Sequence, residues 1–283
     1  MRIDTHMHIG GEAVGFTMTE SMVLEAMAKY QINYAIVSNC DAAEMDHQQK
    51  LLPENMQISQ EAALARTLQF ARNHPDKIGV AVWAKPYLQG LSKELEIMIR
   101  ENIDIIYAIK LHPCHSNVAP TDGRVRPYLE LAVKYHLGVV SHTGGCEVAS
   151  PVQLCEVAKQ YPEIPFVMVH MGLGSDNKEA LALLGQQENL YGDTTWVPME
   201  TTMEAIRRYG SKKILFGSDA PIDGVDTYLC NPKGEPSMYQ EYFHILPEKI
   251  LQKEYEDLMY KNAIRVLGIK NAYFVDKKDK NMI

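Results

Sequence analysis

Short apolar runs alternate with longer amphipathic stretches along most of the chain. The apolar runs have the length and the content of branched residues that are typical of buried strands, and the stretches between them show helical spacing. The predicted strands span residues 2–8, 34–38, 78–83, 105–111, 138–142, 165–170, 190–194 and 213–218. The predicted helices include residues 60–74, 126–135, 151–161, 179–187 and 200–209, and Thr17 with Glu20 resembles a capping box before an earlier helix.

Eight strands that alternate with helices predict one parallel sheet with helical crossovers. Parallel strands that are covered on both faces are apolar almost throughout, as in the run Pro165-Phe-Val-Met-Val. A closed barrel of eight such units needs about 250 residues, and the chain has 283. We therefore predict an α/β protein with a single (β/α)8 TIM barrel over residues 1–268 and a C-terminal tail over residues 269–283.

Polar side chains stand at the ends of five predicted strands. They are His6 and His8 in the first strand, Lys110 and His112 in the fourth, His142 in the fifth, His170 in the sixth and Asp219 in the eighth. The C-terminal ends of the strands form the active-site mouth of a barrel. We therefore expect these side chains to converge there.

The pair His6 and His8 points to one side of its strand because strand side chains alternate. Two imidazoles on one face suit a transition-metal ion, whereas the plain alternative is two polar residues near the N-terminus. His142 and His170, taken singly, would be hydrogen-bonded structural histidines, and Asp219 would be a turn residue. Four inward imidazoles with a carboxylate, however, call for a compensating cation.

Lys110 and His112 should both face the mouth, with Trp83 and Lys85 as pocket walls at the end of the third strand. Lys110 could bind a substrate carboxylate, carry a CO₂ adduct between two metals, or form a buried ion pair. Surface positions are expected for the remaining helical and loop histidines. These include His47, His74, His136 and His244.

Composition narrows the choice of partners. The net charge of −8, without a basic stretch, argues against nucleic acid or an anionic membrane. The five cysteines include no Cys-x-x-Cys pair, so neither a disulfide framework nor a cysteine zinc module is expected. No leader segment or membrane-spanning run is visible, which makes the cytoplasm the expected compartment. Residues 220–236, rich in Pro, Gly and Asp, are expected to form an active-site loop.

Together the strand ends resemble the amidohydrolase superfamily, in particular the branch called amidohydrolase family two, which includes aminocarboxymuconate-semialdehyde decarboxylase. The stretches that carry the resemblance are residues 4–8, 109–113, 140–144, 169–172, 215–221 and 261–265. The likeness spans roughly residues 1–268. It implies a metallo-dependent hydrolase barrel.

The resemblance also implies roles for individual residues. His6, His8, His142 and Asp219 would ligate one divalent metal ion, with zinc expected. His170 would act as the polarising or proton-shuttling group. Lys110 matches the position that is carboxylated in two-metal relatives, but we expect it to be unmodified here.

A divalent ion held by imidazoles and a carboxylate lowers the pKa of water towards neutrality. This predicts hydrolysis of a small, acidic ester, lactone or amide, with His170 and Asp219 as catalytic residues and Trp83, Lys110 and His112 binding the substrate. The alternative is metal-dependent decarboxylation of an unsaturated or aromatic acid, with Lys110 or Arg124 as carboxylate anchor. A phosphoesterase and a non-catalytic metal module fit less well. The expected partner is a small molecule, and a homodimer is the default guess for the assembly.

Overall fold

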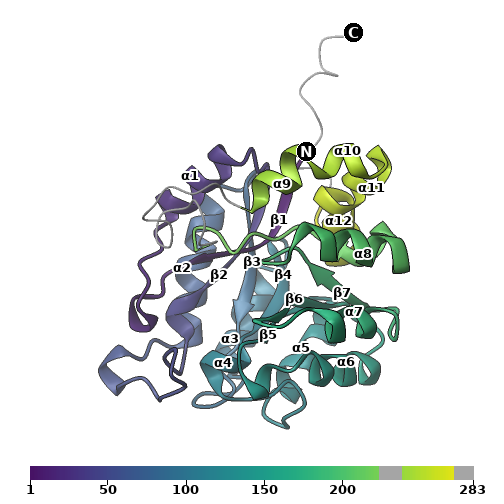
Figure 1. The fold of residues 1–283 in the computed structure, drawn as a ribbon. Coiled ribbons are helices and arrows are strands. Elements are labelled where there is room, and N and C mark those ends of the chain that lie inside the picture. The colour runs from purple at the N-terminus through teal and green to yellow at the C-terminus, as the bar shows by residue number, and fades with distance from the viewer. Residues whose placement is uncertain (223–237, 271–283) are drawn as a thin grey trace.

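The computed structural model describes residues 1–222 and 238–270, and it contains all eight predicted strands (Figure 1). The strands are β1 (Ile3–Ile9), β2 (Tyr34–Asn39), β3 (Ile78–Trp83), β4 (Ile106–Leu111), β5 (Gly138–Gly144), β6 (Phe166–Leu173), β7 (Leu190–Asp193) and β8 (Ile214–Leu215). β8 is shorter than the predicted 213–218, because the chain leaves the ladder after Leu215.

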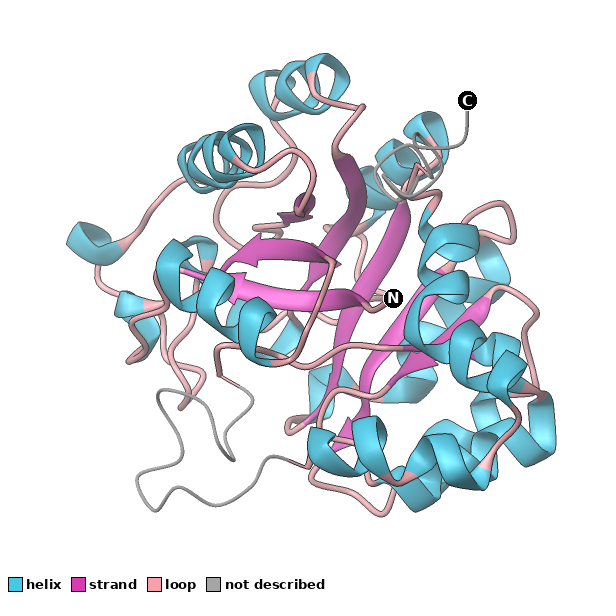
Figure 2. Ribbon diagram, turned by 90° about the horizontal axis from the view of Figure 1, so that it is seen from above, coloured by secondary structure: helices cyan, strands magenta, loops and turns pink. Residues whose placement is uncertain are grey.

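The strands form one parallel sheet in the order β1 to β8. Backbone hydrogen bonds join its two edges: Thr5 N donates to Phe216 O, Asp219 N to His6 O, and His8 N to Ala220 O. The sheet therefore curls back on itself, and Figure 2 shows it from above with helices around it. This confirms the predicted (β/α)8 barrel.

Helices follow the strands and cover the outside of the sheet (Figure 1). The outer helices are α1 (Glu20–Lys29), α2 (Gln60–Asn73), α3 (Lys93–Glu101), α5 (Arg126–Tyr135), α6 (Pro151–Gln160), α7 (Lys178–Leu184) and α8 (Met199–Tyr209). Helix α3 was not predicted, and α5 has the predicted bounds. The first helix is capped by the hydroxyl of Thr19, which accepts from Met22 N, and not by Thr17 as the sequence suggested.

Shorter helices sit in the loops and at the C-terminal end. They are α4 (Pro113–Ser116), α9 (Tyr239–His244), α10 (Leu246–Lys249), α11 (Gln252–Glu256) and α12 (Asn262–Leu267). Single turns occur at η1 (Glu12–Val14), η2 (Cys40–Ala42), η3 (Glu54–Met56), η4 (Glu147–Ala149) and η5 (Ser211–Lys213), and η6 (Asp257–Lys261) is a π-helical turn. Residues 261–265, part of the family resemblance, begin at the end of η6 and continue into α12.

The interior of the barrel is apolar at one end. Ile3, Tyr34, Val140 and Val167 belong to one buried cluster there, and α12 adds Leu267 to it. Burial of this apolar surface stabilises the closed sheet. The polar strand-end residues occupy the opposite end of the barrel, because side chains further along the same strands lie nearer its C-terminal mouth.

Some predictions fall where the structure gives no description. Residues 223–236 of the expected active-site loop, Cys230 within it, and the tail from residue 271 lie outside the described residues. Within the described ranges, no helix combines the length and the hydropathy needed to cross a membrane.

Asn262 offers a test of how α12 is attached to the barrel. Its buried Nδ2 donates to the carbonyls of Ser211 and Ile214, each at 2.7 Å. Replacing Asn262 by Ala leaves both carbonyls without this donor, so we expect the free energy of unfolding to fall by about 2–3 kcal/mol. Urea denaturation measures this. Gln252→Ala, which removes an exposed hydrogen bond to Glu256, is the control, and equal midpoints for both variants would contradict the assignment.

Candidate metal centre and active site

His6, His8 and Asp219 form a compact group at the C-terminal end of the barrel. One ligand atom from each lies within 4.8 Å of the others. His8 Nε2 is 2.9 Å from His6 Nε2 and 3.0 Å from Asp219 Oδ1. Ligands of one tetrahedral zinc ion lie about 3.3 Å apart, given bond lengths of about 2.0–2.1 Å, so this group has suitable spacing for one ion.

The closing of the barrel places Asp219 beside the two histidines. Asp219 N donates to His6 O at 2.9 Å, which joins the residues after β8 to β1. Gly217 makes the approach possible, because an added Cβ there would lie 2.6 Å from Thr195 Oγ1 and 2.8 Å from Asp193 Oδ2. Asp219 itself has φ of 64°. Such strained backbone is concentrated at functional sites.

His6 is oriented by residues that follow β7. Thr195 Oγ1 donates to Asp193 Oδ2 at 2.6 Å and lies 3.3 Å from His6 Nδ1. Because Thr195 gives its hydroxyl proton to Asp193, its oxygen accepts a hydrogen bond from His6 Nδ1–H. Nε2 of His6 therefore keeps its lone pair for a metal. Burial raises the pKa of Asp193 to about 7. Sequence reasoning missed this support because neither residue stands in a motif.

Asp219 is held from two sides. His8 Nε2 contacts its Oδ1, and Trp196 Nε1 donates to its Oδ2 at 3.1 Å. Burial by itself would raise the pKa of Asp219, but the hydrogen bond from His8 and the nearby charge of Lys110 outweigh it and lower that pKa. The side chain is therefore an ionised carboxylate, which is the form that ligates a cation.

These donors fit a divalent transition metal. Burial lowers the pKa of both His6 and His8, so the imidazoles are neutral near neutral pH and available as ligands. Ser38 Oγ, 2.9 Å from His8 Nδ1, fixes the second ring. Two neutral imidazoles and an ionised carboxylate in a buried cluster form a donor set that could hold zinc, iron or manganese.

Lys110 lies against this group from β4. Its Nζ is 2.6 Å from His6 Nε2, and the side chain is buried. Burial lowers the pKa of Lys110 to about 8, although Asp219 opposes the shift. The lysine does not line the cavity described below. Direct contact with a substrate carboxylate therefore stays a prediction.

His142 stands apart from the three-residue group. Its Nε2 donates to Gly144 O at 3.1 Å, and its ring centroid is 4.7 Å from that of His170. The structure thus places His142 beside the centre without making it a ligand. Its predicted role in the metal shell stays a prediction.

His170 lies between the metal group and the cavity. Its ring centroid is 5.8 Å from that of His6, and Nδ1 is 3.2 Å from Thr195 O. A carbonyl only accepts, so Nδ1 carries the proton and Nε2 has a free lone pair. Burial lowers the pKa of His170 to about 4. The backbone is again left-handed, with φ of 66°.

A cavity of about 330 Å³ opens above these residues. Trp83 and His112, both predicted to bind substrate, line it, as do His170 and Asp219. The Trp83 and His112 rings stack with centroids 5.1 Å apart, and His112 stacks on His142 at 4.2 Å. The three stacked rings form an aromatic column along one side of the cavity.

Two predicted contacts are wrong. Lys85 is not a wall of this cavity, because its Nζ donates to Ile58 O and Gln57 Oε1. Arg124 pairs with Asp122 at 2.8 Å on the exposed surface, so it does not anchor a carboxylate in the cavity. Lys85 is held by the segment before α2, and Arg124 by a carboxylate two residues earlier in its own loop.

Two cavity residues were missed by sequence reasoning. His47, expected on the surface, is exposed yet lines the cavity, and Trp196 lines it as well. His115 and Cys114, in the segment after His112, also line the cavity. His115 stands three residues after His112, so one turn of a helix after β4 could have indicated it. Nothing local in the sequence pointed to His47 or Trp196, since both come from loops.

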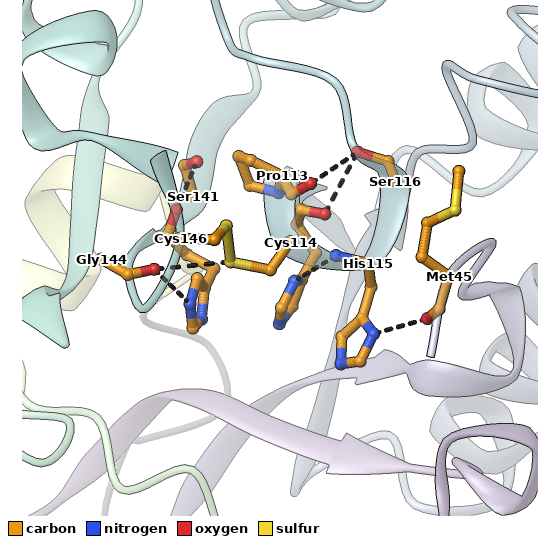
Figure 3. Close-up of a disulfide and its surroundings, with 10 residues drawn as sticks. Met45, Pro113, Cys114, His115, Ser116, Ser141, Gly144 and Cys146 are labelled. Carbon is orange, nitrogen blue, oxygen red and sulfur yellow. Dashed lines mark hydrogen bonds between the residues drawn. A yellow bond between two sulfur atoms is a disulfide. The ribbon is translucent and has the colours of Figure 1, made fainter. Parts of the chain in front are cut away.

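The expectation that the chain has no disulfide framework needs a correction. Cys114 and Cys146 form a disulfide across 32 positions of sequence. Figure 3 shows it linking α4 to the segment after β5, next to Gly144. An odd cysteine count does not exclude one pair, and these two residues meet only because strands β4 and β5 are neighbours. Cys40 and Cys155 are unpaired and buried.

Comparisons with known proteins agree with the fold and add a family. The family model described as "Amidohydrolase" matches residues 3–269. A search of curated proteins gave no match.

Solved structures of similar fold are numerous. One is a 4-oxalomesaconate hydratase from Rhodopseudomonas palustris, 17% identical, with a TM-score of 0.68 and 99% of each chain covered. A 2,6-dihydroxybenzoate decarboxylase in complex with 2,6-dihydroxybenzoate is 12% identical, with a TM-score of 0.64 and coverage of 94% of this chain and 99% of the other. A probable 2-pyrone-4,6-dicarboxylic acid hydrolase from Acinetobacter baumannii is 14% identical, with a TM-score of 0.61 and coverage of 94% and 99%. At these identities the likeness shows the fold alone.

Trp196 provides a test of how the carboxylate is held. Replacing it by Phe keeps an aromatic ring but removes the donor to Asp219, so we expect zinc to bind about tenfold more weakly. Competition with a chromophoric chelator measures the dissociation constant. Trp83→Phe is the matched control, because Trp83 lines the same cavity and its ring stacks on His112. Unchanged zinc binding by Trp196→Phe would refute the proposed support.

The disulfide can be tested by stability. Replacing Cys114 and Cys146 together by Ser opens a closed loop with a separation of 32 residues, which should lower the free energy of unfolding by about 3–4 kcal/mol. Urea denaturation of the oxidised protein and of the variant gives the difference. Cys155→Ser, which breaks no disulfide, serves as control. If a dithiol reductant does not lower the stability of the wild type, the disulfide contributes nothing.

Proposed function

Because the chain belongs to the amidohydrolase family, whose model covers residues 3–269, we propose that it is a metal-dependent enzyme that hydrolyses a small ester, lactone or amide. The observation that carries this proposal is the group of His6, His8 and Asp219 at the floor of a cavity that His170 also lines. A ligand group that opens onto a cavity suits catalysis, whereas a purely structural metal site is closed.

We assign the metal site to His6, His8 and Asp219, with His142 as the fourth ligand and zinc as the expected ion. When bound, the ion acts as a Lewis acid and lowers the pKa of water towards neutrality. Thr195 orients the His6 ring and Ser38 orients the His8 ring, each through a contact with Nδ1.

Two residues handle the protons in this proposal. The ionised carboxylate of Asp219 accepts the first proton of the attacking water as the new bond to the carbonyl carbon forms. Nε2 of His170, unprotonated because Nδ1 donates to Thr195 O, accepts the second and hands it to the leaving oxygen or nitrogen as its bond to carbon breaks. The products are the carboxylate and the alcohol or amine, with one proton released.

A second candidate is the non-oxidative decarboxylation of an unsaturated or aromatic acid. The aromatic lining of Trp83, His112 and His142 favours it, because the edges of these stacked rings suit contact with the face of a planar substrate. The similar fold of the 2,6-dihydroxybenzoate decarboxylase adds to this candidate. The two reactions differ in product, since only the second releases CO₂.

His170 tests both candidates. Replacing it by Asn keeps a polar side chain but removes the proton relay, so we expect turnover to fall about 10²-fold or more. The metal content, measured by mass spectrometry on the purified protein, should not change. His136→Asn, an exposed position with φ of 54°, is the matched control.

Two results would contradict the proposal. Loss of metal in His170→Asn would make that histidine a ligand. Full activity after complete removal of metal would exclude a metal-dependent reaction. A pH-stat with ester and lactone panels, run beside a CO₂ assay with aromatic acids, decides between hydrolysis and decarboxylation.

A further inference from the structure

His112 and His115 stand side by side in the wall of the cavity. His112 caps α4 and His115 lies within it, and their ring centroids are 4.4 Å apart. Both line the cavity. Neither belongs to the group that could hold the metal.

The hydrogen bonds of His115 determine which of its nitrogens is free. Nδ1 is 2.7 Å from the carbonyl oxygen of Met45. That oxygen only accepts, so Nδ1 carries the proton and Nε2 of the neutral ring is an acceptor. Figure 3 shows the second ring nitrogen of His115 on the side of the ring away from Met45.

His112 has the opposite arrangement. Its Nδ1 accepts the backbone N–H of His115 at 3.3 Å. The proton of the neutral ring is therefore on Nε2, which is a donor. Stacking between Trp83 and His142 fixes the plane of this ring. The two histidines thus offer one donor and one acceptor.

The backbone around this pair is firmly held. The N–H groups of Glu44 and Met45 both donate to His115 O, at 2.8 and 2.9 Å. On the other side, Cys114 is bonded to Cys146. Helix α4 is therefore attached to the loops after β2 and β5, and the imidazoles it carries are preorganised.

The charges nearby do not favour an anion. Among the described residues that line the cavity there is no lysine or arginine, and Asp46 adds a carboxylate beside His47. Burial lowers the pKa of His115 to about 4, so this ring is not a cation near neutral pH, and His112 is held neutral by its Nδ1, which accepts a backbone N–H. The acidic substrate expected from the sequence has no cationic anchor in this part of the cavity.

We propose that His112 and His115 form a substrate subsite for a neutral polar group that both accepts and donates, such as a carboxamide or a hydroxyl. His112 Nε2–H donates to that group, and His115 Nε2 accepts from it. This inference rests on the proposed function, because it concerns the end of the substrate away from the reacting carbonyl. A carboxylate would fit badly, since it has only acceptors to offer to the lone pair of His115.

A pair of ketone probes without an ester or lactone bond tests this by binding, and chromatography of the samples checks that the carboxamide stays intact during the measurement. 4-Acetylcyclohexanecarboxamide and 4-acetylcyclohexanecarboxylate have the same size and differ in the group that would reach the subsite. The two tryptophans of the chain, Trp83 and Trp196, both line the cavity, so intrinsic fluorescence reports occupancy. For the wild-type holoprotein we expect the carboxamide to bind about tenfold more tightly than the carboxylate.

His115→Phe keeps a flat ring and removes the acceptor, so the preference should shrink to about twofold or less. His47→Phe is the matched control, because His47 contacts His115 only through its ring, with centroids 5.3 Å apart, and its preference should equal that of the wild type. Thermal melts establish that both variants are folded.

A second measurement needs no variant. Nitrogen-15 spectra of histidine-labelled wild-type protein should show one ring in the Nδ1–H form whose unprotonated Nε2 shifts on addition of the carboxamide. Equal or tighter binding of the carboxylate would overturn the proposal, as would no binding of the carboxamide. Failure of the hydrolysis and CO₂ assays with normal binding would instead refute only the proposed function.

Discussion

Everything in this site depends on two imidazoles and a carboxylate whose ligand atoms are held within 4.8 Å of one another in a buried place. His6 and His8 reach it because alternate residues of β1 face the same side, and Asp219 reaches it because the chain after β8 bonds back to β1 through His6 O. In this group the carboxylate is ionised and both imidazoles are neutral, which is the combination that ligates a cation. The closure of the barrel and the assembly of the three ligands therefore depend on the same backbone contact between β1 and the residues after β8.

The surroundings follow from that constraint. Thr195 and Asp193 fix the tautomer of His6, and Trp196 holds the second oxygen of Asp219. His170, bonded through Nδ1 to the same β7 loop, keeps a free nitrogen towards the cavity. The loop after β7 thus contacts the imidazole of His6, the carboxylate of Asp219 and the proton-relay residue His170. His170, Trp196 and Asp219 all have left-handed backbone, a strained conformation that places their side chains at the site.

Much of this was predictable from sequence, and the reasons are local. Strand periodicity and the position of polar residues at strand ends indicated the barrel and brought His6, His8 and Asp219 together. What failed depended on contacts between loops. Lys85 donates to the neutral oxygens of Ile58 and Gln57, and Arg124 pairs with Asp122, contacts that no periodicity reveals. The Cys114–Cys146 disulfide and the cavity position of His47 arise from loops that meet only in the folded barrel. The short β8 shows that strand length is set by pairing as well as by apolar content.

The measurement that tests the account most directly is anomalous diffraction from crystals of the full chain, recorded on both sides of the absorption edge of zinc after the protein is loaded with that metal. The account predicts one anomalous peak within bonding distance of His6 Nε2, His8 Nε2 and an oxygen of Asp219, with an unmodified Lys110. No peak at these three side chains would contradict the central claim. Two peaks bridged by a modified Lys110 would contradict the single-ion assignment.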